Sequence, residues 1–124
     1  MTTIALTRPQ SRLTTGVLWA LQIISAGLFL MAGVSKLAGA ATMVQLFETL
    51  GIGQWFRYLT GGIEVAGAIL LLIPSLASYG AAALAITMIG AIITHLFIIG
   101  GNPAVPILLL ASTSTIAWMK RGGR

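Results

Sequence analysis

Long apolar runs, separated by short polar, glycine- and proline-containing breaks, dominate the 124-residue sequence. No charged residue occurs between Arg12 and Lys36, and the later runs end at Pro74, at Asn102-Pro103 and at Lys120. A helix crosses the hydrocarbon core of a bilayer, about 30 Å thick, with about 20 apolar residues. The pattern predicts four transmembrane helices in one domain, 1–124, that is, an all-α integral membrane four-helix bundle. The predicted spans are about 16–36, 58–74, 79–99 and 104–119.

A shorter helix is predicted over residues 41–50, between the first two spans. Its apolar side chains follow the i, i+3, i+4, i+7 spacing of one helix face: Met43, Leu46, Phe47 and Leu50. A segment of this length cannot cross a membrane, so we expect an amphipathic helix that lies in the interface. Gly51-Ile52-Gly53 ends it, and the aromatic residues that follow are typical of the membrane–water boundary. These residues are Trp55, Phe56 and Tyr58.

The composition excludes an ordinary soluble enzyme and a disordered chain. Hydrophobic residues make up 57% and charged residues 7%, whereas soluble domains carry roughly a quarter charged residues. Cysteine is absent, which excludes disulfides, thiolate metal sites and a thiol nucleophile within this chain.

The formal net charge of +5 comes largely from basic residues near the two ends. These residues are Arg8, Arg12, Lys120, Arg121 and Arg124. Four spans place both ends on one side, and basic flanks mark the cytoplasmic side. We therefore expect a multi-pass protein of the inner (plasma) membrane with both termini in the cytoplasm, surrounded by the lipid bilayer and without a nucleic-acid partner.

The first apolar run has one competing interpretation, a secretory signal peptide cleaved near Ala38-Gly39-Ala40. The run is longer than the roughly 7–15 apolar residues of a signal peptide. The sequence therefore favours an uncleaved anchor.

The ionisable residues inside the predicted spans fall in one half of the bundle. With both termini inside, Lys36 and Arg57 lie near the outer surface. Glu64 lies about 10 Å and His95 about 6 Å below it, at about 1.5 Å of rise per residue. An unpaired carboxylate at that depth is costly, so we expect Glu64 to contact Lys36, His95 or Arg57. These four residues are the candidates for ligand binding or proton exchange; no catalytic residue is assigned.

Two stripes and two small-residue motifs refine this picture. On the first span, one helix stripe is polar at both ends and is expected to face protein: Gln22, Ser25, Phe29, Ala32 and Lys36. On the third span, a second stripe leads to the histidine: Leu84, Met88, Ala91 and His95. Gly62-x-x-x-Ala66 and Ala83-x-x-x-Thr87-x-x-x-Ala91 have the spacing of close helix packing. A competing interpretation is that the charges only fix helix register, or that Lys36 and Arg57 extend to the interface.

Other site chemistries find little support. One histidine and two acidic residues are too few for a typical catalytic zinc site, and we expect no metal. A single histidine cannot supply both axial ligands of a haem, and no serine lies in a nucleophile-elbow sequence. No covalently bound cofactor is expected.

Several ordered motifs resemble the DoxX-like family of small bacterial four-helix membrane proteins, over about residues 17–110. They are Ala32-Gly33-x-x-Lys36-Leu37, Gly51, Gly61-Gly62-Ile63-Glu64-Val65-Ala66-Gly67-Ala68, Tyr79-Gly80-Ala81 and Met88-x-Gly90-Ala91-x-x-Thr94-His95. The family takes its name from a small subunit associated with a thiosulfate:quinone oxidoreductase. Other members are linked to membrane oxidoreductase complexes and protection from oxidative stress. The positions that match the family pattern are Gly33, Lys36, Glu64, Gly67, Ala68 and His95.

Three functions therefore compete. The first is an accessory subunit of a membrane redox complex with a periplasm-facing oxidoreductase partner, in which an outer-leaflet pocket holds a quinone or similar small apolar ligand. The second is a structural or assembly protein without its own ligand, and the third is a small-solute carrier. Catalysis by this chain alone is not expected, and a homo-oligomer is left open.

Overall fold

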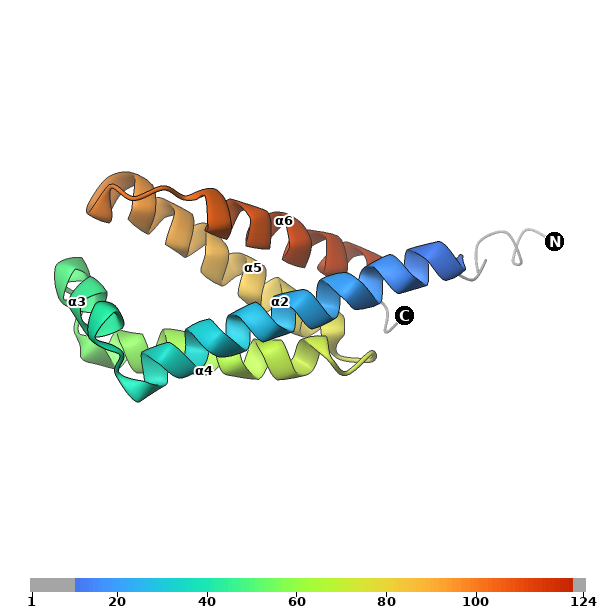
Figure 1. Ribbon diagram of the computed structural model, residues 1–124, viewed down its shortest axis with the longest axis horizontal. Coiled ribbons are helices and arrows are strands. Elements are labelled where there is room, and N and C mark those ends of the chain that lie inside the picture. The colour runs from blue at the N-terminus through green and yellow to red at the C-terminus, as the bar shows by residue number, and fades with distance from the viewer. Residues whose placement is uncertain (1–10, 122–124) are drawn as a thin grey trace.

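The computed structural model describes residues 11–121, and these residues form helices joined by short turns, without a β-strand (Figure 1). The elements are α2 (Arg12–Ala38), α3 (Ala41–Leu50), α4 (Gln54–Leu71), α5 (Ala77–Thr94), a π-helical turn η1 (His95–Ile99) and α6 (Ala104–Met119). The predicted all-α class is confirmed. Arg8 and Arg124, two of the basic residues used to predict topology, lie outside the described residues.

Local chemistry sets the helix ends. The Ser11 side chain accepts a hydrogen bond from the Thr14 backbone N–H and so caps the start of α2. Gly39 and Gly51 adopt φ of 75° after α2 and α3, the left-handed conformation that glycine adopts readily. The second predicted span, 58–74, differs from α4, which begins at Gln54 and ends at Leu71. Its earlier end is expected because a proline disfavours helical geometry in the residue before it.

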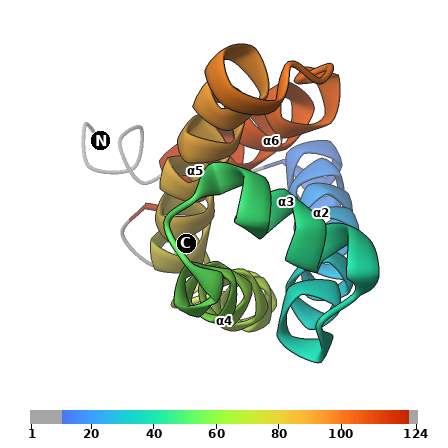
Figure 2. The same ribbon diagram turned by 90° about the vertical axis from the view of Figure 1, so that its left-hand side faces the viewer.

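The long helices form two antiparallel pairs (Figures 1 and 2). α2 packs along α4, and α5 packs along α6, while α4 also contacts α5. The pairs are close together at the end of the bundle toward which α2 begins and α6 ends, which we call the terminal end (Figure 1). They separate toward the opposite end, where α3 lies; we call this the α3 end.

Two glycine contacts bring the helices together around α4. A Cβ on Gly61 would lie 3.0 Å from the Gly33 carbonyl oxygen, and a Cβ on Gly80 would lie 2.8 Å from the Gly67 carbonyl oxygen. Backbone therefore meets backbone between α2 and α4 and between α4 and α5, the kind of approach that small residues permit.

The small-residue motifs predicted from the sequence do not make these backbone contacts, although Ala91 packs against the apolar core. A Cβ on Gly62 would meet nothing within 4 Å, and Ala66 and Ala83 are exposed. The reason is helical phase: Gly61, one position earlier, shares a face with the buried Glu64 and Ala68, and Gly62 is turned away from it.

Side chains from neighbouring helices satisfy carbonyl groups at three helix C-termini. The Gln22 amide donates to the Leu71 carbonyl over 2.7 Å, and the Ser78 hydroxyl donates to the Ala117 carbonyl over 2.9 Å. The Arg57 guanidinium donates to the Lys36 carbonyl. The last carbonyls of a helix lack partners within their own helix, so these bonds tie the helices together. The apolar core packs beside them: Ala26, Phe29, Ala68, Leu71, Ala77, Ala81, Leu84, Met88 and Ile116.

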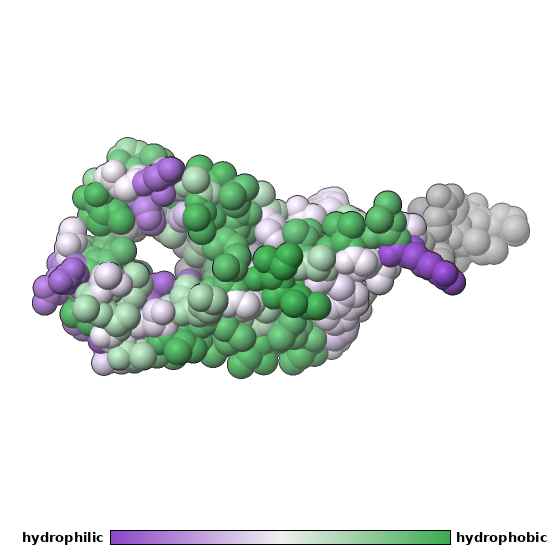
Figure 3. All heavy atoms as spheres, in the orientation of Figure 1, coloured by the Kyte–Doolittle hydropathy of each residue, from purple (hydrophilic) through white to green (hydrophobic). Residues whose placement is uncertain are grey.

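The exterior is apolar along the helices. Two helical stretches, Arg12–Ala38 and Ala77–Ile99, are long and apolar enough to cross a membrane, and Ala104–Met119 is a shorter apolar helix. Large apolar side chains such as Met31 and Phe97 are 70% and 79% exposed. Hydrophobic residues cover much of the visible face between polar ends (Figure 3). That α4 and α6 also cross the membrane remains a prediction.

Candidate functional site

The buried acid of α4 is paired with the amine of α2. Lys36 Nζ lies 2.7 Å from Glu64 Oε1, and the side chains are 14% and 2% exposed. The Gly33–Gly61 contact holds the two helices close beside this pair. Side chains tilt toward the N-terminus of their own helix, and in this antiparallel pair the two tilts point toward each other. The prediction that Glu64 contacts Lys36, His95 or Arg57 is therefore confirmed for Lys36.

His95 begins the π-helical turn η1 at the end of α5. Its Nδ1 lies 2.8 Å from the Ala91 carbonyl oxygen one turn earlier. A carbonyl can only accept, so Nδ1 carries the proton, and in the neutral ring Nε2 is left as an acceptor. The imidazole is thus oriented by its own helix and is not hydrogen-bonded to Glu64.

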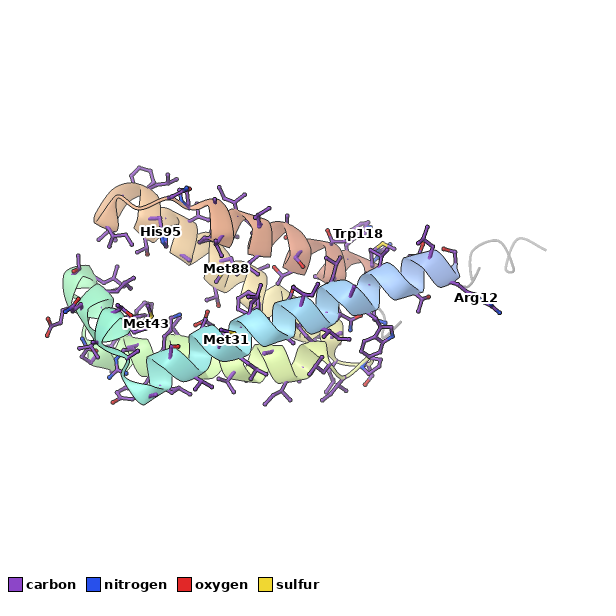
Figure 4. The ribbon with its side chains drawn as sticks, viewed as in Figure 1. Arg12, Met31, Met43, Met88, His95 and Trp118 are labelled. Atoms are coloured by element: carbon purple, nitrogen blue, oxygen red, sulfur yellow. The ribbon has the colours of Figure 1, made fainter. Side chains whose placement is uncertain are left out.

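A cavity of about 590 Å³ lies at the α3 end between the two helix pairs. Lys36 and Glu64 line it from one side and His95 from the other, so the three groups predicted to gather line the same cavity. The rest of the wall is mainly apolar, and Met43 and Met88 approach it from α3 and α5 (Figure 4). The space-filling view shows an opening at this end of the molecule (Figure 3).

α3 covers this cavity, a role that its pattern alone did not reveal. The apolar face predicted from the spacing lines the cavity: Met43, Leu46, Phe47 and Leu50. Phe47 is 3% exposed and packs against Phe56 of α4 with ring centroids 6.0 Å apart. The Gln54 amide also donates to the Val44 carbonyl over 3.1 Å. The apolar face of α3 therefore packs on protein and on the cavity.

Arg57, the fourth candidate, lies apart from the cavity wall. Its side chain donates to the Lys36 carbonyl and, over 2.7 Å, to Gln54 Oε1, and its guanidinium stacks on the Tyr58 ring at 4.4 Å. A cation at a helix C-terminus also interacts favourably with the helix dipole. In the structure Arg57 fixes the end of α2 and does not balance the Glu64 charge directly.

Three threonines on the cavity wall were not predicted as site residues. Thr60, Thr87 and Thr94 line the cavity, and each hydroxyl donates to a carbonyl one turn earlier in its own helix. Their i to i−4 hydrogen bonds are common for hydroxyl residues in helices. Threonine in an apolar helix carries no signal of its own that could have marked them.

The fold and the site together define an all-helical, apolar protein with a largely apolar cavity and a buried ion pair on its wall. The chain belongs to the DoxX-like family, which it matches over residues 20–117. The family and the two apolar helices indicate a membrane protein.

One curated relative is a Bacillus subtilis (strain 168) protein named "Putative oxidoreductase CatD". The two are 31% identical over 74 residues, which is 60% of this chain and 55% of the relative. The chain thus spans about half the length of that relative. No solved structure matches the chain.

Proposed function

We propose that the chain is a membrane-embedded four-helix protein that binds a small, lipid-soluble ligand of the quinone type in the cavity at the α3 end. The observation that carries this proposal is the cavity itself. Its volume of about 590 Å³ is within the roughly 300–1,000 Å³ of small-molecule sites. Such sites combine apolar walls with a few placed polar groups, here Lys36, Glu64 and His95.

The ion pair supports a ligand role because it keeps polar chemistry available inside an apolar wall. Glu64 Oε1 takes part in the ion pair but accepts no hydrogen bond of good geometry from the described residues. The Lys36 ammonium has three donors, and its side chain borders the cavity. A ligand oxygen beside this pair would therefore find both a donor and an acceptor.

The proposed setting is a membrane redox complex. The relative's printed name refers to an oxidoreductase, and the chain belongs to the DoxX-like family. Among the described residues no group of three or more His, Cys, Asp or Glu side chains could hold a metal ion. The family and the relative's name support an accessory role, in which the chain would hold the quinone while a partner oxidoreductase on the α3 side supplies the redox chemistry.

The proposed topology has four crossings, with both termini in the cytoplasm and the α3 end facing outward. Arg12 lies at the start of α2, and Lys120 and Arg121 follow α6, so these basic residues are at the terminal end. Alkaline phosphatase or green fluorescent protein fused after Arg124 tests this topology. We expect fluorescence without phosphatase activity, and the opposite pattern contradicts a cytoplasmic C-terminus and hence this topology.

Ligand binding is tested with the full chain in lipid nanodiscs and decylubiquinone as the probe. We expect saturable quenching of tryptophan fluorescence and a raised unfolding temperature. Ala91→Phe fills the cavity wall without altering an ionisable group and should abolish both effects. Thr115→Val is the matched control, because Thr115 is exposed on α6 with its hydroxyl bonded to the Ala111 carbonyl. Absence of any quinone-dependent change in the unaltered protein contradicts the proposal.

A purely structural role is favoured by one observation, namely that the polar groups of α2 and α4 are already engaged with each other. Lys36 pairs with Glu64 and its carbonyl accepts from Arg57. For this role the unaltered protein should bind no quinone, and Glu64→Gln should change only stability or recovery of a complex. Reduced quinone affinity in Glu64→Gln at unchanged stability contradicts it.

A further inference from the structure

The polar groups on the cavity wall have largely used their donors before any ligand arrives. The Thr60 hydroxyl donates to the Phe56 carbonyl over 2.8 Å. The Thr87 and Thr94 hydroxyls donate to Ala83 and Gly90 carbonyls, each over 2.9 Å. A hydroxyl has one hydrogen to donate and two lone pairs. These three side chains can therefore only accept from a ligand.

His95 and Glu64 have the same property. In the neutral His95 ring the Nδ1 proton is committed to the Ala91 carbonyl, which leaves Nε2, on the other side of the ring, as an acceptor. The Glu64 carboxylate, as the anion of an ion pair, only accepts. Lys36 is the single donor side chain among the polar residues that line the cavity, and it is already beside Glu64.

The acceptors lie on both sides of the cavity. Thr60 and Glu64 belong to α4, whereas Thr87, Thr94 and His95 belong to α5 and η1 across the space between the helix pairs. A ligand with hydroxyl groups on opposite edges of one ring can offer a donor to each wall. A quinone, which has carbonyl oxygens there, can be matched only by Lys36.

We propose that this cavity selects the reduced, hydroxyl-bearing form of a quinone couple over the oxidised form. This proposal rests on the proposed function and adds the redox state of the ligand. A quinone carbonyl placed against an acceptor gains no hydrogen bond, whereas a ligand hydroxyl in the same place donates one. A tenfold preference would raise the potential of the bound two-electron couple by about 30 mV, since tighter binding stabilises the reduced form.

The test compares three probes with the full chain in nanodiscs under anaerobic conditions: decylubiquinol, decylubiquinone and the dimethyl ether of decylubiquinol. We expect decylubiquinol to bind at least about tenfold more tightly than decylubiquinone, the factor that one or two net hydrogen bonds supply. The dimethyl ether keeps the ring and oxygens but has no donor, and it should bind no better than the quinone. This comparison needs no variant and so does not depend on variant folding.

His95→Phe keeps a ring of similar size and should lower the preference for decylubiquinol while retaining decylubiquinone binding. Thr115→Val, an exposed change on α6 that does not line the cavity, is the control and should retain the preference. Equal affinities for the three probes in the unaltered protein overturn the donor argument and leave the proposed function standing. Binding of none of them overturns the proposed function as well.

Discussion

The neighbouring glycines Gly61 and Gly62 offer a direct test of how α2 packs on α4. A Cβ at Gly61 would lie 2.9 Å from Lys36 Cβ, 3.0 Å from the Gly33 carbonyl oxygen and 3.1 Å from Leu37 Cγ. Two of these atoms belong to backbone or to the first side-chain carbon and cannot rotate away. At Gly62 a Cβ would meet nothing within 4 Å. Gly61→Ala and Gly62→Ala therefore add the same methyl group to a closed and to an open position.

The expected effects have opposite signs. Non-bonded carbon atoms prefer about 3.5–4.0 Å, so α2 must move away from α4 by roughly 0.5–1 Å to accept Ala at position 61. Overpacking of this kind costs about 1–3 kcal/mol, whereas alanine gains up to about 1 kcal/mol over glycine inside a helix. Gly61→Ala should therefore lose about 1 kcal/mol or more in the free energy of unfolding. Gly62→Ala should gain about 0.5–1 kcal/mol.

The measurement is reversible unfolding in mixed micelles, with increasing denaturing detergent and helix content followed by circular dichroism. Gly61→Ala should also weaken quinone binding, because it displaces Lys36 from Glu64. If the two variants were equally stable, or if both gained stability, the close Gly33–Gly61 packing would be refuted.

The same unfolding assay tests the Lys36–Glu64 ion pair and two buried polar side chains, Gln22 and Arg57. Lys36→Met leaves the 2% exposed Glu64 carboxylate unpaired and should lower the free energy of unfolding by about 3 kcal/mol. Glu64→Gln leaves an ammonium that is 14% exposed and should lower it by about 1 kcal/mol. Equal losses would show that the pair is not buried as described. Gln22→Glu sets an acceptor against the Leu71 carbonyl in a fully buried position and should cost about 3 kcal/mol or more. Gln22→Met should cost about 1 kcal/mol or less, since it also removes an amide oxygen that accepts no hydrogen bond. Similar losses of stability in the two Gln22 variants would contradict the hydrogen bond from Gln22 to the Leu71 carbonyl. Arg57→Lys keeps the charge but loses the planar guanidinium that donates both to Gln54 and to the Lys36 carbonyl, and it should cost about 1–2 kcal/mol of stability. An unchanged stability would mean that the positive charge alone is sufficient.

The helices could be located from the sequence because apolar runs and their breaks carry that information. Predicted residues 79–99 and 104–119 compare with Ala77–Ile99 and Ala104–Met119 in the structure. The 41–50 helix coincides with α3, because Gly51 in a left-handed conformation ends it. The predicted second span begins at residue 58, four residues after the start of α4, because aromatic residues at positions 55, 56 and 58 are typical of the interface and also fit the first helical turns.

The site was predicted in part, and for a physical reason. A buried acid needs a cation, and Lys36 was one of the candidates within reach of Glu64. The choice among them depends on which helices touch and in which phase, which no single segment specifies. For the same reason the packing glycine was assigned to position 62, although the backbone contact is made at position 61. A one-residue shift rotates a helix position by about 100°.

The packing of α2 on α4 and the chemistry of the cavity depend on the same contact. Gly33 and Gly61 bring the backbones together, and the side chains that meet beside them are Lys36 and Glu64. Any change that separates these helices should therefore lower stability and ligand affinity together. Ala91→Phe should lower affinity alone, because it fills space from α5 and leaves the α2–α4 contact intact. If Gly61→Ala lost stability but kept full affinity for decylubiquinone, the ligand would not depend on the ion pair, and its polar contacts would have to come from the α5 side.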